Sequence, residues 1–114
     1  MPHFIIDCSE NLISLKSPDV IIENVYDAAE STALFDPGDI KVRINPFKYY
    51  NVGDTKNDFV HIFANIMEGR TVEQKAMLSK TVVTKLKQVF PEVPILSMNI
   101  RDFEAGTYFN KPMI

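Results

Sequence analysis

The 114-residue chain is 46% hydrophobic and 24% charged, which is ordinary for one soluble globular domain. Its formal net charge of -3 and its pI of about 5.3 argue against a nucleic-acid-binding protein, which normally has a basic surface. No apolar run reaches the roughly 18 residues of a membrane span, and the opening MPHFIIDCSE lacks the pattern of a secretory signal. We therefore expect a cytoplasmic protein that binds neither nucleic acid nor membrane.

The first half of the chain predicts a strand, a helix and a second strand. Residues 2–8 are rich in Phe and Ile and predict a buried strand. Ser17 and Pro18 place an N-cap residue before proline at the first helical position. The sequence FDPG at residues 35–38 is expected to end that helix. Apolar and polar residues alternate over residues 40–45, which predicts a strand with one apolar face.

The second half predicts the same order of elements. Residues 59–67 form a long apolar run and predict a central strand, and residues 95–103 predict another strand before a tail. Between them, Thr71 and Gln74 fit a capping box at the start of a helix that ends at Pro91. The expected apolar face of this helix consists of Val72, Ala76, Val83, Leu86 and Val89.

These elements predict one α+β domain over residues 1–114, built from two β-α-β halves at about 1–57 and 58–114. A strand–helix–strand unit within one sheet has parallel strands. We therefore expect a four-stranded mixed sheet with both helices on one face. The other face would remain half apolar and uncovered, which favours a homo-oligomer.

Familiar catalytic and metal-binding motifs are absent from the sequence. His3 and His61 lie among apolar neighbours and are interpreted as structural histidines whose polar atoms are satisfied. Cys8, the single cysteine, is interpreted as a small buried residue rather than a nucleophile. We expect no metal site.

Proline at position 2 is the one feature that suggests chemistry. Removal of Met1 would leave the secondary amine of Pro2 at the end of a buried strand. An α-amino group has a pKa of roughly 7.7–8.0, and both burial and nearby cations lower the pKa of an amine. Such an amine is suited to act as a general base at neutral pH.

Four segments resemble the 5-carboxymethyl-2-hydroxymuconate isomerase family of the tautomerase superfamily. They are PHFIIDCS at residues 2–9, GDIKVR at 38–43, DFVH at 58–61 and GRT at 69–71. The resemblance covers nearly the whole chain in order, and the first and last of these segments are the most specific.

The resemblance implies a tautomerase-like fold of two β-α-β units and a homotrimer. It implies an isomerase that catalyses an enol–keto or allylic proton shift in an unsaturated 2-hydroxy di- or tricarboxylate, during the degradation of aromatic acids. Pro2 would be the general base, and no cofactor or metal would be required. The substrate would be a small anion whose dienolate intermediate is stabilised by cationic side chains.

Arg70 is the first candidate for such a cation. It matches the GRT motif and immediately precedes a helix N-terminus, which favours anions. The family has Arg-x-Arg on the returning strand, whereas this chain has Lys41-Val42-Arg43. Because lysine lacks the bidentate fork of arginine, either Lys41 or Arg43 could bind the substrate.

Two alternatives stay open at the level of sequence. A hydratase or dehalogenase would use a protonated Pro2 as the acid and a separate carboxylate, for which Asp7 or Glu68 are candidates, to activate water. A non-enzymatic module would bind a metabolite or a partner, with Pro2 incidental. Both mechanisms that use Pro2 require Met1 to be removed, because an amide nitrogen is not basic.

Overall fold

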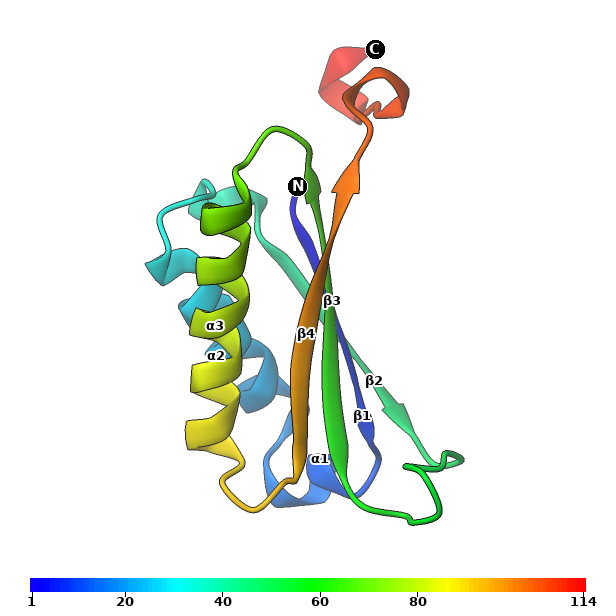
Figure 1. Cartoon of the computed structure of the whole chain (residues 1–114). Helices are drawn as coiled ribbons and strands as arrows, with labels where there is room; N and C mark the ends of the chain where they lie inside the picture. The colour runs from blue at the N-terminus through cyan, green and yellow to red at the C-terminus, as the bar shows by residue number, and fades with distance from the viewer.

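The computed structural model describes all of residues 1–114 as a sheet covered on one side by helices (Figure 1). The strands are β1 (His3–Ser9), β2 (Lys41–Phe47), β3 (Phe59–Met67) and β4 (Ile95–Phe103), and the helices are α1 (Leu12–Leu15), α2 (Pro18–Ser31) and α3 (Val72–Val89). Short 3-10 turns lie at Pro37–Asp39, Ala105–Thr107 and Lys111–Met113. No helix is both long enough and apolar enough to cross a membrane.

The four strands have the order β2-β1-β3-β4. The pairs β1–β2 and β3–β4 are parallel, and the central pair β1–β3 is antiparallel. Both long helices cover the same face of this sheet (Figure 1). The predicted α+β class, the mixed four-stranded sheet and the placement of the helices are therefore confirmed.

The core lies between the sheet and the two long helices. Alternate residues of β1 and β3 are fully or almost fully buried on this side, and both helices supply aliphatic side chains from above. The buried residues are Phe4, Ile6 and Cys8 of β1, Val60, Ile62, Ala64 and Ile66 of β3, Ile21, Val25, Ala28 and Ala29 of α2, and Leu78, Val82 and Leu86 of α3. The intervening residues of the strands lie on the opposite, open face of the sheet.

The predicted start of α3 is confirmed in detail. The Thr71 hydroxyl accepts a hydrogen bond from the Gln74 backbone at 3.1 Å, and the Gln74 side chain accepts one from the Thr71 backbone at 2.9 Å. The predicted apolar face of this helix was wrong at its first positions. Val72 is 73% exposed, and Ala76 is also exposed. Ala76 precedes Leu78 by two residues and therefore lies about 200° around the helix from it.

The end of α2 also differs from the prediction. The helix stops at Ser31, before the FDPG segment, because Thr32 caps it and Ala33 adopts a left-handed conformation with φ of 58°. The Thr32 hydroxyl donates to the Ala29 carbonyl at 2.7 Å. The one-turn helix α1 was not predicted, although its Leu12 is fully buried in the core.

We predict that Leu78→Ala lowers the free energy of unfolding by about 2–5 kcal/mol, since it removes a fully buried side chain and leaves a cavity. Val72→Ala, the matched control on the same helix, should change it by less than about 0.5 kcal/mol. Urea unfolding followed by circular dichroism measures both. Equal losses in the two variants would contradict the observed orientation of α3.

Candidate active site

The start of the chain lies at the end of the sheet that also carries the connections entering β2 and leaving β3 (Figure 1). His3 pairs with Lys41 of β2 on one side and with Asn65 of β3 on the other. Pro2 is buried, and its carbonyl oxygen accepts a hydrogen bond from the Lys41 backbone at 3.1 Å. The parallel pairing of β1 with β2 thus brings the predicted base and a predicted cation together.

Two amines converge beside Pro2 on a single backbone oxygen. The Asp39 carbonyl accepts from the Met1 amine at 3.2 Å and from Lys41 Nζ at 2.7 Å. Burial lowers the pKa of the Met1 amine, and the hydrogen bond and charge of Lys41 lower it further, against the opposing charge of Asp39. This corner of the molecule therefore disfavours the protonated form of an amine.

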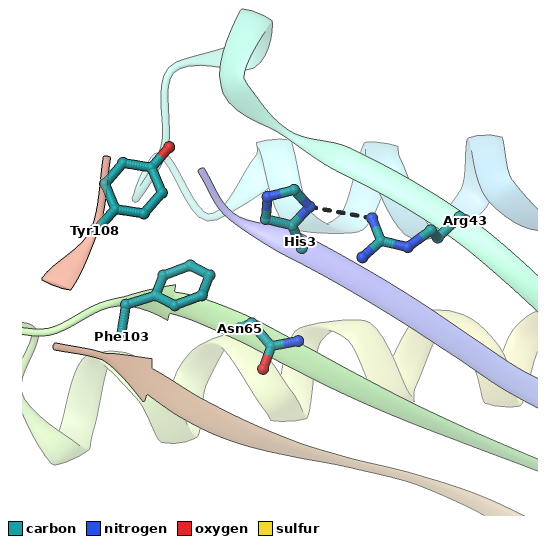
Figure 2. A pocket seen from close by; sticks show the side chains of 5 residues that line it. All are labelled: His3, Arg43, Asn65, Phe103 and Tyr108. Carbon is teal, nitrogen blue, oxygen red and sulfur yellow. Dashed lines mark hydrogen bonds between the residues drawn. The ribbon is translucent and has the colours of Figure 1, made fainter. Parts of the chain in front are cut away.

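A pocket of about 290 Å³ opens on the sheet face next to the chain start (Figure 2). Adjacent strands contribute His3, Arg43 and Asn65, and the end of β4 and the segment after it contribute Phe103 and Tyr108. The two aromatic rings lie together with their centroids 5.7 Å apart. The pocket thus combines polar side chains from the sheet with an aromatic wall from the C-terminal segment.

His3 and Arg43 form a hydrogen bond across the two strands, with 3.1 Å between His3 Nδ1 and Arg43 Nη1. Because a guanidinium can only donate, Nδ1 must accept, which places the imidazole proton on Nε2. Burial lowers the pKa of His3, and the charges of Arg43, Lys41 and the chain amine lower it further. His3 is therefore neutral at neutral pH.

Arg70 lies in the connection between β3 and α3, on the helix side of the same end of the sheet. Its Nη2 donates to the Leu34 carbonyl at 2.7 Å and its Nη1 to the Met67 carbonyl at 3.4 Å. The guanidinium stacks on Phe35, with Cζ 4.6 Å from the ring centroid. Arg70 thus ties the segment after α2 to the end of β3, and it does not line the pocket of Figure 2.

The structure brings Pro2, Lys41 and Arg43 together around the first residues of β1, while Arg70 approaches the same sheet end from the other face. The sequence analysis missed Asn65, Phe103 and Tyr108 as candidate site residues, and it interpreted His3, which also lines the pocket, as a structural histidine. Of the three missed residues, Asn65 was the easiest to predict from the sequence, since it is a polar residue within an apolar strand. Phe103 and Tyr108 carried no such signal, because their place depends on the path of the chain beyond β4.

The other singled-out residues lie outside this site. His61 is a satisfied structural histidine, as predicted, with Ser97 Oγ 2.7 Å from Nδ1 and Asn99 Oδ1 2.6 Å from Nε2. Cys8 is 1% exposed, and burial raises the pKa of its thiol to about 11, which keeps it unreactive.

The two candidate acids of the hydratase mechanism are also engaged elsewhere. The Asp7 carboxylate accepts a hydrogen bond from the Asn45 amide at 3.4 Å within the sheet. The Glu68 carboxylate accepts from the backbone of Ala105. No group of three or more His, Cys, Asp or Glu side chains is arranged to hold a metal ion.

Comparison with known proteins gives consistent matches over most of the chain. The family model described as 5-carboxymethyl-2-hydroxymuconate isomerase matches residues 2–114. The 5-carboxymethyl-2-hydroxymuconate Delta-isomerase of Escherichia coli is 25% identical over 92 residues, which span 79% of this chain and 73% of that protein.

Two solved structures illustrate the likeness in fold. A 5-carboxymethyl-2-hydroxymuconate isomerase from Deinococcus radiodurans R1 superposes with a TM-score of 0.82 at 21% identity, covering 96% of this chain and 88% of that one. A structure described as a fused 4-OT wild type symmetric trimer superposes with a TM-score of 0.80 at 14% identity, covering 96% and 94% of the two chains.

We predict that Arg43→Gln raises the pKa of His3 toward the ordinary value of roughly 6.5, because the variant removes a neighbouring positive charge. The pKa should remain lowered, since burial is its largest cause. A titration of the His3 ring by NMR measures the shift, with Lys87→Gln on the exposed side of α3 as the control. An unchanged pKa in Arg43→Gln would contradict the contact.

The same shift has a consequence for stability. The pKa of His3 is lower in the folded protein than in the unfolded chain, so the unfolded chain binds more protons at His3 when the pH falls below about 6.5. The free energy of unfolding therefore decreases as the pH falls below that value.

Proposed function

Because the chain belongs to the 5-carboxymethyl-2-hydroxymuconate isomerase family, within the tautomerase superfamily, we propose that it catalyses an enol–keto or allylic proton shift in an unsaturated 2-hydroxy di- or tricarboxylate. A substrate such as 5-carboxymethyl-2-hydroxymuconate, formed in the cytoplasm during the breakdown of an aromatic acid, fits this chemistry. The observation that carries the proposal is the position of Pro2, which is buried beside Lys41 and directly precedes His3, a residue that lines the pocket with Arg43.

The proposed base is the amine of Pro2 after removal of Met1. The Met1 amine already has a lowered pKa at this corner, through burial and through the hydrogen bond and charge of Lys41. The nitrogen of Pro2 lies one residue closer to β1, and its residue is buried beside Lys41. We propose that burial and the charge of Lys41 lower the pKa of the Pro2 amine in the same direction once Met1 is removed. A neutral secondary amine at neutral pH accepts a proton directly, and the ring of proline restricts the orientation of its nitrogen.

In the proposed reaction, Pro2 takes the proton from the 2-hydroxyl group of the substrate. The O–H bond breaks, a C=O bond forms, and the negative charge of the dienolate is shared between oxygen and the conjugated carbons. The protonated Pro2 then returns the proton to a distant carbon, where a C–H bond forms as the double bond shifts. The amine is regenerated, and no redox step or cofactor is needed.

Three cations are proposed to stabilise the anionic substrate and its dienolate. Lys41 and Arg43 lie beside the chain start on the open face. Arg70 has N–H groups beyond those that bind the Leu34 and Met67 carbonyls, and it lies close to the first turn of α3, where the helix dipole also favours negative charge. Fixed positive groups of this kind lower the energy of a developing enolate.

The proposed assembly is a homotrimer. The open face of the sheet carries apolar side chains, including Ile5 and Phe63, which pair across β1 and β3. A structural neighbour is described as a symmetric trimer. Packing of this face against other copies would cover it and would allow a neighbouring subunit to complete the site.

The isomerase proposal predicts that loss of the free amine of Pro2 slows ketonisation by about 10²–10⁴-fold. A form that retains Met1 has an amide at this nitrogen and should show the full loss. Pro2→Ala, which keeps a primary amine, should be impaired less. Ultraviolet absorbance of a 2-hydroxymuconate-type enol measures the rate, and intact mass verifies the processing of each sample.

Arg70→Gln should lower kcat by about 10²-fold if its charge acts on the dienolate, whereas Lys87→Gln, a matched loss of charge on α3, should have no effect. Thermal unfolding checks that Arg70→Gln remains folded, because Arg70 also supports the segment after α2. An inert wild-type protein, or equal rates in the processed and Met1-retaining forms, would overturn the proposed function.

A further inference from the structure

The connection between α2 and β2 carries the backbone carbonyl that lies next to the chain start. It covers residues 32–40 and runs along the end of the sheet where β1 begins (Figure 1). Its last turn is Pro37–Asp39. The Asp39 carbonyl accepts from the Met1 amine at 3.2 Å and from Lys41 Nζ at 2.7 Å. The path of this connection therefore decides where the ammonium group of Lys41 is held.

The connection is anchored on both sides of this turn. Before the turn, Phe35 packs against Phe4 of the core, with 6.1 Å between the ring centroids, and against the Arg70 guanidinium. After the turn, Ile40 is 8% exposed and belongs to the core. The turn itself contains no buried residue, so its position between the two anchors depends on hydrogen bonds.

One hydrogen bond ties this turn to the helix layer. Tyr26 of α2 donates its hydroxyl to the Pro37 carbonyl at 3.1 Å, from a ring that packs against the core. The bonds within the turn are local. The Asp36 carboxylate accepts from the Gly38 backbone at 3.1 Å, and the Asp36 carbonyl accepts from the Asp39 backbone at 2.9 Å. These local bonds give the turn its shape, and the Tyr26 bond fixes it relative to α2.

The Asp39 carbonyl matters most after Met1 has been removed. It then loses one of its two amine donors and keeps Lys41 Nζ. The Lys41 backbone donates to the Pro2 carbonyl at 3.1 Å, so the Lys41 side chain starts beside Pro2. Lys41 is exposed, and a long exposed side chain without a partner would populate many rotamers. The carbonyl thus keeps a positive charge close to the chain start.

We propose that Tyr26 is a positioning residue for the Pro2 amine. Its hydroxyl fixes the turn Pro37–Asp39, the Asp39 carbonyl binds the Lys41 ammonium, and the charge of Lys41 disfavours protonation of Pro2. The catalytic use of this amine rests on the proposed function. The chain of contacts from Tyr26 to Lys41 stands on the geometry alone.

Several elements contribute charged or titratable groups to this end of the sheet. Lys41 lowers the pKa of the chain amine, and the charge of Asp39 opposes it. The remaining groups are the side chains of His3, Arg43, Glu68 and Arg70. Their hydrogen bonds do not involve Tyr26 or the turn. A change at Tyr26 therefore acts on the amine through Lys41 and Asp39.

Tyr26→Phe tests the proposal, because it removes the hydroxyl and keeps the packed ring. In Met1-processed protein labelled with ¹⁵N-proline, NMR titration should show the pKa of the Pro2 amine raised by about 0.5 of a pH unit or more, which is part of the roughly 1–3 that an adjacent charge can cause. Tyr50→Phe is the matched control. Its hydroxyl donates to the Lys56 carbonyl, also at 3.1 Å, in the loop at the other end of the sheet, and its loss should leave this pKa unchanged.

A double variant shows whether Tyr26 acts through Lys41. In a Lys41→Gln background, Tyr26→Phe should cause no further rise in the pKa of Pro2, because the ammonium that it positions is gone. A full rise in that background would overturn the proposal, and so would an equal rise in Tyr50→Phe or no rise in Tyr26→Phe. A lowered pKa would also overturn it, since that sign is expected if the Asp39 carbonyl binds the protonated Pro2 amine directly.

The pH profile of the reaction separates this proposal from the proposed function. With an enol substrate, the acidic limb of kcat/KM should move to higher pH in Tyr26→Phe by the amount measured for the pKa of Pro2. A limb that stays in place while the pKa moves would contradict a role of Tyr26 in positioning the base. A protein that shows the expected pKa values but does not ketonise the enol would refute the function and leave the contacts from Tyr26 to Lys41 intact.

Discussion

The parallel pairing of β1 with β2 is the constraint on which the site depends. It begins with the hydrogen bond from the Lys41 backbone to the Pro2 carbonyl and continues with His3 opposite Lys41 and Ile5 opposite Arg43. A slip of one residue would move every side chain of β2 to the other face. The buried Phe4 and Ile6 prevent such a slip in β1, since they occupy the core beneath the helices.

The same end of the sheet concentrates positive charge, and the structure limits the resulting repulsion by engaging each cation separately. Lys41 binds a backbone carbonyl, and Arg70 binds two carbonyls and an aromatic face. His3 remains neutral and accepts a hydrogen bond from Arg43. Under the proposed mechanism, this arrangement allows an amine to remain unprotonated beside cations that bind an anionic substrate.

Local patterns predicted much of this structure. The capping box of α3 and the bounds of β3 and β4 follow from residue types at short spacing, and the structure has them where they were predicted. Pro2 was chosen for its position behind Met1 and for the family resemblance, and Lys41 and Arg43 were chosen because they stand where the family has Arg-x-Arg. The sheet register places them at the same end of the sheet.

Features that depend on contacts between distant segments were predicted poorly. Val72 was wrongly assigned to the apolar face of α3, because the spacing of apolar residues does not show where the helix crosses the sheet. The contact of Arg70 with Leu34 joins residues 36 positions apart, and Tyr108 reaches the pocket only because the chain turns back after β4. Residue spacing alone contains no information about such contacts.

The ionisation of the Pro2 amine tests the central claim most directly. Titration of a ¹⁵N-proline-labelled, Met1-processed sample by NMR should give a pKa for this amine below the ordinary α-amino range of roughly 7.7–8.0. Lys41→Gln should raise it. A pKa within or above that range, unchanged by Lys41→Gln, would contradict the assignment of Pro2 as the base.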